Sequence, residues 1–172
     1  ANVWNNYNEY DAWAGFLAML DPKFVAELLT TTQTVARNTV TDGGSYETVT
    51  SKMFLASTTE VGLANENNIA EGSLLALFSN DASRVAYPTA QCVNNADGYT
   101  NSSFATSKGW YWWLRTPYSS IARIVRGVIS GGSLDGIVAC YGSRGVRPLC
   151  NLKSSILVSD SPNSDGNYTV IY

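Results

Sequence analysis

The strongly apolar run at residues 110–114 limits what this chain can fold into. It reads Trp-Tyr-Trp-Trp-Leu, with a glycine before it and Arg-Thr-Pro after it. Such a dense aromatic stretch has to be buried, and its short length between turn-forming residues is typical of a β-strand. A membrane-spanning helix needs about 20 apolar residues. The run therefore predicts a core strand, and no membrane insertion by this chain is expected.

Hydrophobic periodicity predicts helices before this strand. Apolar residues recur at spacings of three and four over residues 12–29, and Asp21 and Pro22 are placed to begin a helix as N-cap and first-turn residue. A second short helix is predicted at residues 71–78, where four apolar side chains follow a glutamate.

The remaining segments predict strands and loops. β-Branched residues at 30–41 lead to a turn at residues 42–44, and a long surface loop rich in Asn, Ser and Thr is expected at residues 87–108. Short strands are predicted at residues 52–57, 123–130, 136–141, 146–158 and 168–172. These elements predict an α+β fold, with early helices packed on a mainly antiparallel twisted sheet with long loops.

Length and charge restrict the domain count and the partners. The 172 residues can bury one good core, so a single domain over residues 1–172 is expected. The 11 lysines and arginines do not outnumber the 14 acidic residues, so nucleic acid is not an expected partner. No signal peptide is visible at the start. Because the sequence begins at Ala1 rather than Met, we interpret it as a processed product or as part of a longer protein.

The chain has no histidine, which excludes Ser/His/Asp and Cys/His mechanisms and removes the commonest transition-metal ligand. Most acidic residues of the chain are interpreted as solvated or capping groups. Five of the acidic residues follow no catalytic or calcium-loop spacing: Glu60, Glu66, Glu71, Asp81 and Asp97. We therefore predict that the chain is not an enzyme, and we assign no catalytic residue, metal site or cofactor.

Cys92, Cys140 and Cys150 are widely spaced and contain no CxxC pair. Free thiols packed as small apolar groups are favoured over a bridge between Cys92 and Cys150.

Two motifs identify a family. The run WWLRTP at residues 112–117 is followed about thirty residues later by GVRP at residues 145–148, and KMFLAS with Glu60 and Val61 lies upstream. This pattern resembles the DUF6273 family of C-type-lectin-like domains, found in gut bacteria and their phages, whose ending reads WWLRSP and then GVRPAL. The resemblance extends from about residue 11 to residue 157, and Leu-Cys stands in place of the family's more usual Ala-Leu at residues 149–150.

Four residues of these motifs are interpreted as structural. Trp112 and Trp113 are expected in and beside the core. Arg115 and Arg147 are expected to satisfy loop carbonyls or a buried carboxylate, because a planar guanidinium can hold several acceptors at once.

Residues 118–144 are interpreted as a variable recognition segment. Apolar and polar residues mix there without a period of two or 3.6, which neither an ordinary loop nor a core element explains. Family members are similar to the variable proteins of diversity-generating retroelements, in which Asn codons of a template are mutated. The resemblance implies a ligand-binding site at thirteen positions that alternate with constant Ala122, Val125, Arg126, Val128, Ala139 and Gly142. These positions are Ser120, Ile121, Arg123, Ile124, Gly127, Ile129, Asp135, Gly136, Ile137, Val138, Cys140, Ser143 and Arg144.

Two observations fit this interpretation. Every residue at the thirteen positions is reachable from an Asn codon by changes in its first two letters, and Asn is abundant before residue 101 but missing from residues 118–150. Ile121, Ile124, Ile137 and Val138 are expected as apolar anchors, and Arg123, Asp135 and Arg144 as polar selectivity groups.

The resemblance implies a protein or glycan ligand on a cell surface, with the domain displayed extracellularly on a phage particle or a bacterial cell, and it implies no particular oligomeric state. Three alternatives stay open. A fixed-specificity lectin would use calcium ligands among Asn94, Asn95, Asp97 and Asn101. An enzyme related to formylglycine-generating enzymes would use cysteines, but Cys140 and Cys150 lack that motif. A structural decoration domain of a virion or cell surface would have no specific partner.

Overall fold

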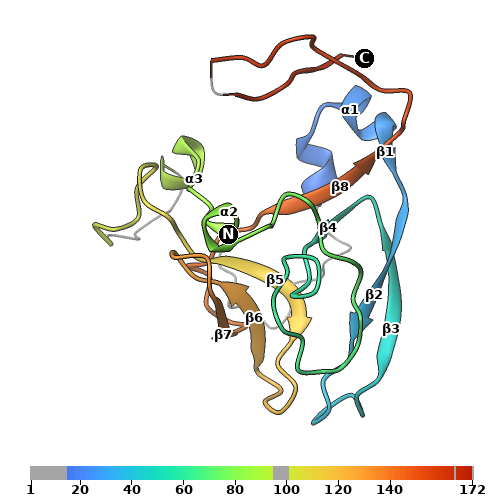
Figure 1. Ribbon diagram of the computed structural model, residues 1–172, viewed down its shortest axis with the longest axis vertical. Helices are drawn as coiled ribbons and strands as arrows, with labels where there is room; N and C mark the ends of the chain where they lie inside the picture. The colour runs from blue at the N-terminus through green and yellow to red at the C-terminus, as the bar shows by residue number, and fades with distance from the viewer. Residues whose placement is uncertain (1–14, 95–100, 165, 172) are drawn as a thin grey trace. The chain divides into compact units, whose positions relative to one another are not determined.

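The computed structural model describes residues 15–94, 101–164 and 166–171. Antiparallel strand pairs dominate it and its helices are short, so the fold class is α+β (Figure 1). Its elements are η1 (Phe16–Met19), α1 (Pro22–Glu27), β1 (Leu28–Leu29), β2 (Thr31–Ala36), β3 (Tyr46–Ser51), β4 (Met53–Leu55), α2 (Asp81–Arg84), α3 (Ala90–Asn94), β5 (Trp112–Pro117), β6 (Ile124–Val128), β7 (Leu134–Val138), β8 (Pro148–Leu152), β9 (Leu157–Val158) and β10 (Val170–Ile171).

The chain forms two compact units. Unit 1 comprises the described residues of 1–31, 50–53 and 150–172, and unit 2 comprises those of 32–49 and 54–149. Among the described residues, no helix is long and apolar enough to cross a bilayer. Unit 2 holds the thirteen predicted ligand-binding residues and the four residues interpreted as structural.

In unit 1, the helix start predicted at Asp21 and Pro22 is confirmed. The Asp21 side chain accepts a 2.8 Å hydrogen bond from the backbone N–H of Lys23, and Pro22 is the first helical residue. The predicted continuation through Leu28 and Leu29 is wrong, because both residues form β1 and pair with β8. Pairing with a distant strand overrides local helix propensity here. Residues 12–14 of the predicted helix lie outside the described residues.

The cysteines are free thiols, as predicted, in the structure. Their predicted packing is wrong for Cys92 and Cys140, which are exposed in unit 2. Cys150, in unit 1, is half-buried, and burial raises the pKa of its thiol.

In unit 2, the extended segment and turn predicted after residue 30 are confirmed. β2 and β3 form a hairpin (Figure 1), and Gly43 and Gly44 in its connection have φ angles of +73° and +69°. Glycine adopts these left-handed conformations readily, because it has no Cβ. The strand predicted at residues 52–57 is also confirmed, as β4.

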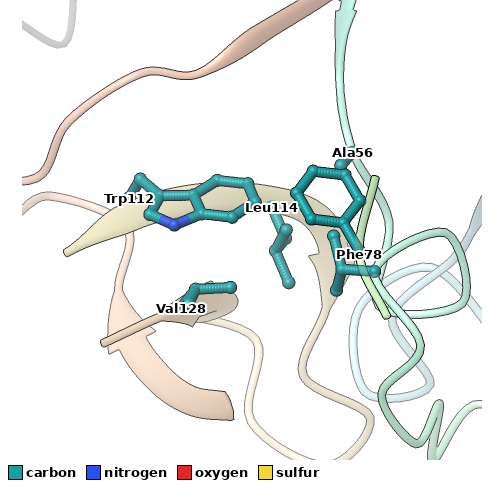
Figure 2. Close-up of a cluster of buried hydrophobic side chains, with 6 residues drawn as sticks. Ala56, Phe78, Trp112, Leu114 and Val128 are labelled. Carbon is teal, nitrogen blue, oxygen red and sulfur yellow. The ribbon is translucent and has the colours of Figure 1, made fainter. Parts of the chain in front are cut away.

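Residues 112–114 of the aromatic run begin β5, an edge strand of a three-stranded antiparallel sheet ordered β5-β6-β7, and Trp110 and Tyr111 precede this strand. Along β5, Trp112, Leu114 and Thr116 are buried while Trp113 is half-buried, so one face of the strand packs into the core. Figure 2 shows the Trp112 indole facing the Phe78 ring, and the two ring centroids are 6.0 Å apart. The core cluster consists of Ala56, Val61, Phe78, Trp112, Leu114 and Val128.

The helix predicted at residues 71–78 is wrong. Gly72 has φ +106°, which no right-handed helix contains, and a Cβ there would lie 2.6 Å from the Glu60 Oε1 atom. Only Phe78 of the four expected apolar residues is buried, whereas the three leucines are exposed. At Gly72 the segment instead passes close against the Glu60 carboxylate, and the Leu75 N–H donates a 2.9 Å hydrogen bond to the Glu60 carbonyl.

Glu60 and Glu71 are buried, so they are exceptions to the expectation that most acidic residues are solvated or capping groups. Arg115 Nη1 and Nη2 lie 2.6 and 3.0 Å from the Glu60 carboxylate. The Glu71 carboxylate, fully buried, accepts hydrogen bonds from the Ala36 N–H, the Asn65 amide and the Thr116 hydroxyl. These contacts make Arg115 and two acidic residues the polar centre of unit 2.

Arg147 has a different environment. Its guanidinium stacks on Phe78 and Trp112, 4.9 and 5.3 Å from their ring centroids. Its Nη1 atom is buried without a hydrogen-bond partner, and burial lowers the pKa of the guanidinium. Arg147 therefore covers the aromatic core, and within the described residues no loop carbonyl is seen to accept a hydrogen bond from it.

Candidate functional site

The recognition segment is organised by the β6–β7 hairpin. Ile124 lies opposite Val138 at its open end, and Val128 lies opposite Leu134 at its closed end. Beyond the open end, the Ala139 N–H donates a 2.9 Å hydrogen bond to the Arg123 carbonyl, which keeps the two chain segments together. Two stretches that are separate in sequence thus meet at this end of the sheet.

Six of the thirteen predicted positions gather there. Ser120, Arg123 and Cys140 are exposed, while the three aliphatic residues between them are half-buried. We call this group the open-end patch; it consists of Ser120, Ile121, Arg123, Ile124, Val138 and Cys140. The patch presents an aliphatic centre with one cationic side chain.

Side chains from other loops support the start of the patch by binding backbone atoms. The Asn38 Nδ2 atom donates to the Tyr118 carbonyl over 2.6 Å, and the Thr39 hydroxyl donates to the Ser119 carbonyl. The Asn67 Nδ2 atom donates to the Pro117 carbonyl over 2.9 Å. Three consecutive carbonyls directly before Ser120 are therefore fixed.

Glu66 completes this support. Its Oε1 atom accepts from the Ser119 N–H over 3.2 Å, and its carboxylate pairs with Arg126 at 2.8 Å. The Arg126 guanidinium also stacks on the Tyr118 ring at 4.2 Å. Arg126, predicted as a constant position, thus links the sheet to the support.

Two predicted ligand-binding residues, Gly127 and Ile137, are buried, so the expectation of an exposed Ile137 anchor is corrected. They share the face of the sheet that carries Asp135, opposite to the face that carries Ile124 and Val138. A Cβ on Gly127 would lie 2.5 Å from the Ile137 Cδ1 atom. Close packing of the isoleucine over the glycine removes both from the ligand-accessible surface.

Because of this packing, Gly127→Asn should lower the free energy of unfolding by about 1–3 kcal/mol through overpacking. Asn is chosen because the resemblance implies an Asn codon at this position of a template. The loss should shrink in an Ile137→Val background, which lacks the Cδ1 atom. Urea denaturation of the four proteins measures this coupling. Gly131→Asn is the control, because a Cβ there meets nothing within 4 Å; equal losses at both glycines would contradict the packing argument.

The other five positions lie apart from the open-end patch or beside it. Gly136 adjoins the patch, since a Cβ there would lie 3.0 Å from Ile124 Cγ2. Asp135 is exposed on the opposite face of β7, and Ile129 lies in the closed turn, where its N–H donates to the Ser133 carbonyl. The structure therefore does not place all thirteen positions on one surface.

Ser143 and Arg144 contact the residues that precede β5. The Ser143 carbonyl accepts a 2.9 Å hydrogen bond from the Trp110 indole, and the Arg144 guanidinium stacks on Tyr111 at 4.2 Å. The Arg144 Nε atom is buried without a hydrogen-bond partner. These contacts hold the segment that follows β7 against the residues that lead into β5.

The alternative sites have little support in the described residues. Asn101 accepts a 2.9 Å hydrogen bond from the Ser103 N–H, as a turn-forming residue does, and Asn94 ends α3. The other two calcium candidates, Asn95 and Asp97, lie outside the described residues. Within residues 15–94, 101–164 and 166–171, no group of three or more Cys, Asp or Glu side chains could hold a metal ion.

Sequence reasoning missed the supporting residues. Asn38, Thr39, Glu66 and Asn67 contact chain segments 50 to 80 residues away. Periodicity and local motifs carry no information about such distant pairs. Their only sequence signal is that Asn and Thr are common turn and capping residues.

Comparisons with known proteins identify the family alone. The model of the family described as "Domain of unknown function (DUF6273)" matches residues 2–154. No curated protein and no solved structure matches the chain. The match covers most of the sequence, including the aromatic strand, the support and the whole recognition segment, and the chain therefore belongs to the DUF6273 family.

Proposed function

We propose that this chain is a C-type-lectin-like ligand-binding domain that recognises a protein or glycan on a cell surface through its open-end patch. The observation that carries the proposal is the contrast between the patch and its support. The patch mixes exposed polar and half-buried aliphatic side chains, whereas the backbone before it is held by four side chains from other loops. A rigid support lowers the entropic cost of binding.

The composition of the patch also favours recognition over catalysis. Three aliphatic side chains can bury apolar area on binding, and one arginine adds a directional charge. None of the six patch residues is a carboxylate or an imidazole, so the patch offers no general base of the usual kinds. These features suit a surface that binds and releases a partner.

We further propose that a retroelement diversifies this surface and that the domain is displayed on a phage particle or a bacterial cell. The absence of Asn from residues 118–150, in a chain otherwise rich in Asn, supports diversification. The buried pair Gly127 and Ile137 limits it, because substitution there disturbs packing. We therefore expect functional variation to concentrate in the open-end patch.

A double substitution tests binding by the patch. The fluorescently labelled chain is first tested on a panel of gut bacteria to find strains that it binds. On those strains the variant Ile121→Asn with Arg123→Asn should bind tenfold or more weakly, because loss of hot-spot side chains costs about 2 kcal/mol or more. The melting temperature should stay nearly unchanged, since Arg123 is exposed and Ile121 is half-buried outside the core cluster. Flow cytometry and differential scanning calorimetry give the two readouts.

Val146→Asn is the matched control, because Val146 is an exposed aliphatic residue, 64% accessible, outside the thirteen positions. Unchanged cell binding by the double variant, or an equal loss with Val146→Asn, would refute recognition by the patch. Diversification has its own test, which is sequencing of the flanking DNA for a near-copy of the segment that differs only at adenines. Without such a copy, the patch would be a binding surface of fixed specificity.

A further inference from the structure

A hollow in unit 2, apart from the open-end patch, has no role in the proposal above. It has a volume of about 310 Å³, near the lower end for small-ligand pockets. β2 and the turn after it, β3 and β5 form its wall. The lining residues are Val35, Ala36, Arg37, Asn38, Asp42, Glu47, Arg115 and Pro117.

Arg115 in this pocket has no donor left for an anionic ligand. A guanidinium has five N–H groups. Nε donates to the Thr34 carbonyl, Nη1 to the Leu55 carbonyl and to Glu60, and Nη2 to Glu60 and to the Glu71 carbonyl. The positive charge of Arg115 is thus matched by the Glu60 carboxylate.

The remaining charges around the pocket are mostly negative. Asp42 and Glu47 are exposed on its wall, and in the described part of the chain neither forms an ion pair. Behind the wall, the Glu71 carboxylate accepts the Ala36 N–H over 2.8 Å, and its other hydrogen-bond partners are neutral side chains. Arg37 supplies the opposing positive charge.

The pocket wall and the groups directly behind it carry four carboxylates and two guanidinium groups. The carboxylates belong to Asp42, Glu47, Glu60 and Glu71, and the guanidinium groups to Arg37 and Arg115. A cation entering the pocket therefore gains attraction from the excess carboxylates. On the wall itself an anion would be attracted by Arg37 alone, because the donors of Arg115 are already engaged, and it would be repelled by the two carboxylates of Asp42 and Glu47.

We infer that this pocket binds a primary ammonium group, either from a lysine side chain of a polypeptide or from an amino sugar. An ammonium is a compact charge with three donors, and it suits carboxylates that come from separate segments better than a planar guanidinium does. The site is distinct from the open-end patch, and the inference does not require the patch to bind a ligand.

Nuclear magnetic resonance titration of the full 172-residue chain tests this site. The probes are N-acetyl-lysine methylamide and glucosamine, with N-acetylglucosamine and N-acetyl-norleucine methylamide as neutral counterparts. We expect saturable shifts in the backbone amides of Arg37, Asp42 and Glu47 with an amine probe and none with its neutral counterpart. A response to the lysine probe alone assigns the site to polypeptides, and a response to glucosamine assigns it to amino sugars.

Variants that remove single charges test whether the pocket prefers cations. Asp42→Asn and Glu47→Gln should each weaken amine binding about two- to fivefold, the range of an exposed ion pair. Arg37→Gln should strengthen binding, because it removes the opposing charge. Asp160→Asn is the matched control, since it removes an exposed carboxylate that does not line the pocket.

The inference is overturned if neither amine shifts the pocket amides, or if Arg37→Gln weakens binding. An equal effect of Asp160→Asn would likewise overturn it, because that result reflects only the overall charge of the chain. All four substituted residues are exposed, and an unchanged amide spectrum away from the pocket verifies that each variant is folded.

Discussion

Arg115→Met should lower the free energy of unfolding by about 3–5 kcal/mol, because removing one partner leaves a buried carboxylate without its counter-charge. Glu60 is 8% exposed, and both of its oxygens lie within 3.0 Å of the Arg115 guanidinium. The substitution also leaves the carbonyls of Leu55 and Glu71 without that donor. Urea denaturation followed by tryptophan fluorescence measures the loss.

Two comparisons make this prediction specific. Arg126→Met removes a more accessible ion pair, with Glu66, and should cost markedly less. Adding Glu60→Gln to Arg115→Met should recover part of the stability, since the unpaired charge disappears. If Arg115→Met costs no more than Arg126→Met, then the buried pair contributes little to the stability of unit 2.

Trp112→Ala should cost about 3–5 kcal/mol, the range for replacing a large buried aromatic residue with alanine. Trp112 is 2% exposed and stacks with Phe78 (Figure 2). Its indole also donates a 3.0 Å hydrogen bond to the Arg84 carbonyl. Arg147 also lies over its ring, so the substitution removes a cation–π contact. Equilibrium unfolding in urea gives the magnitude.

The adjacent tryptophan is the matched control. Trp113 is half-buried and points to the other face of β5. Trp113→Ala should therefore cost less than Trp112→Ala, although the two residues have the same chemistry and neighbouring positions. Equal losses would mean that the two faces of β5 are equally buried.

The sequence predicted those parts of the fold that depend on local chemistry. The N-cap at Asp21, the glycine turn at Gly43 and Gly44 and the aromatic strand all rest on rules that act within a few residues. The failures involve distant partners. Leu28 joins a strand because Leu152 pairs with it, and residues 71–78 avoid a helix beside the buried Glu60.

The candidate site divides in the same way. The sequence predicted two short strands at residues 123–130 and 136–141, where the structure has β6 and β7, and six of the thirteen positions meet at the open end of the hairpin that they form. It did not distinguish the two faces of the strands, so Gly127 and Ile137 entered the set although they are buried. It also gave no sign of the buried Glu71, whose partners come from three separate segments.

The support below the open-end patch has a consequence for how the protein evolves. Asn38, Thr39 and Asn67 hold the carbonyl oxygens of Pro117, Tyr118 and Ser119, and every amino acid has such an oxygen. The anchorage therefore recognises the path of the chain and not its side chains. Substitutions in the neighbouring patch therefore leave the hydrogen bonds of the support intact. Specificity can change through the patch residues while other residues of the sequence maintain the fold.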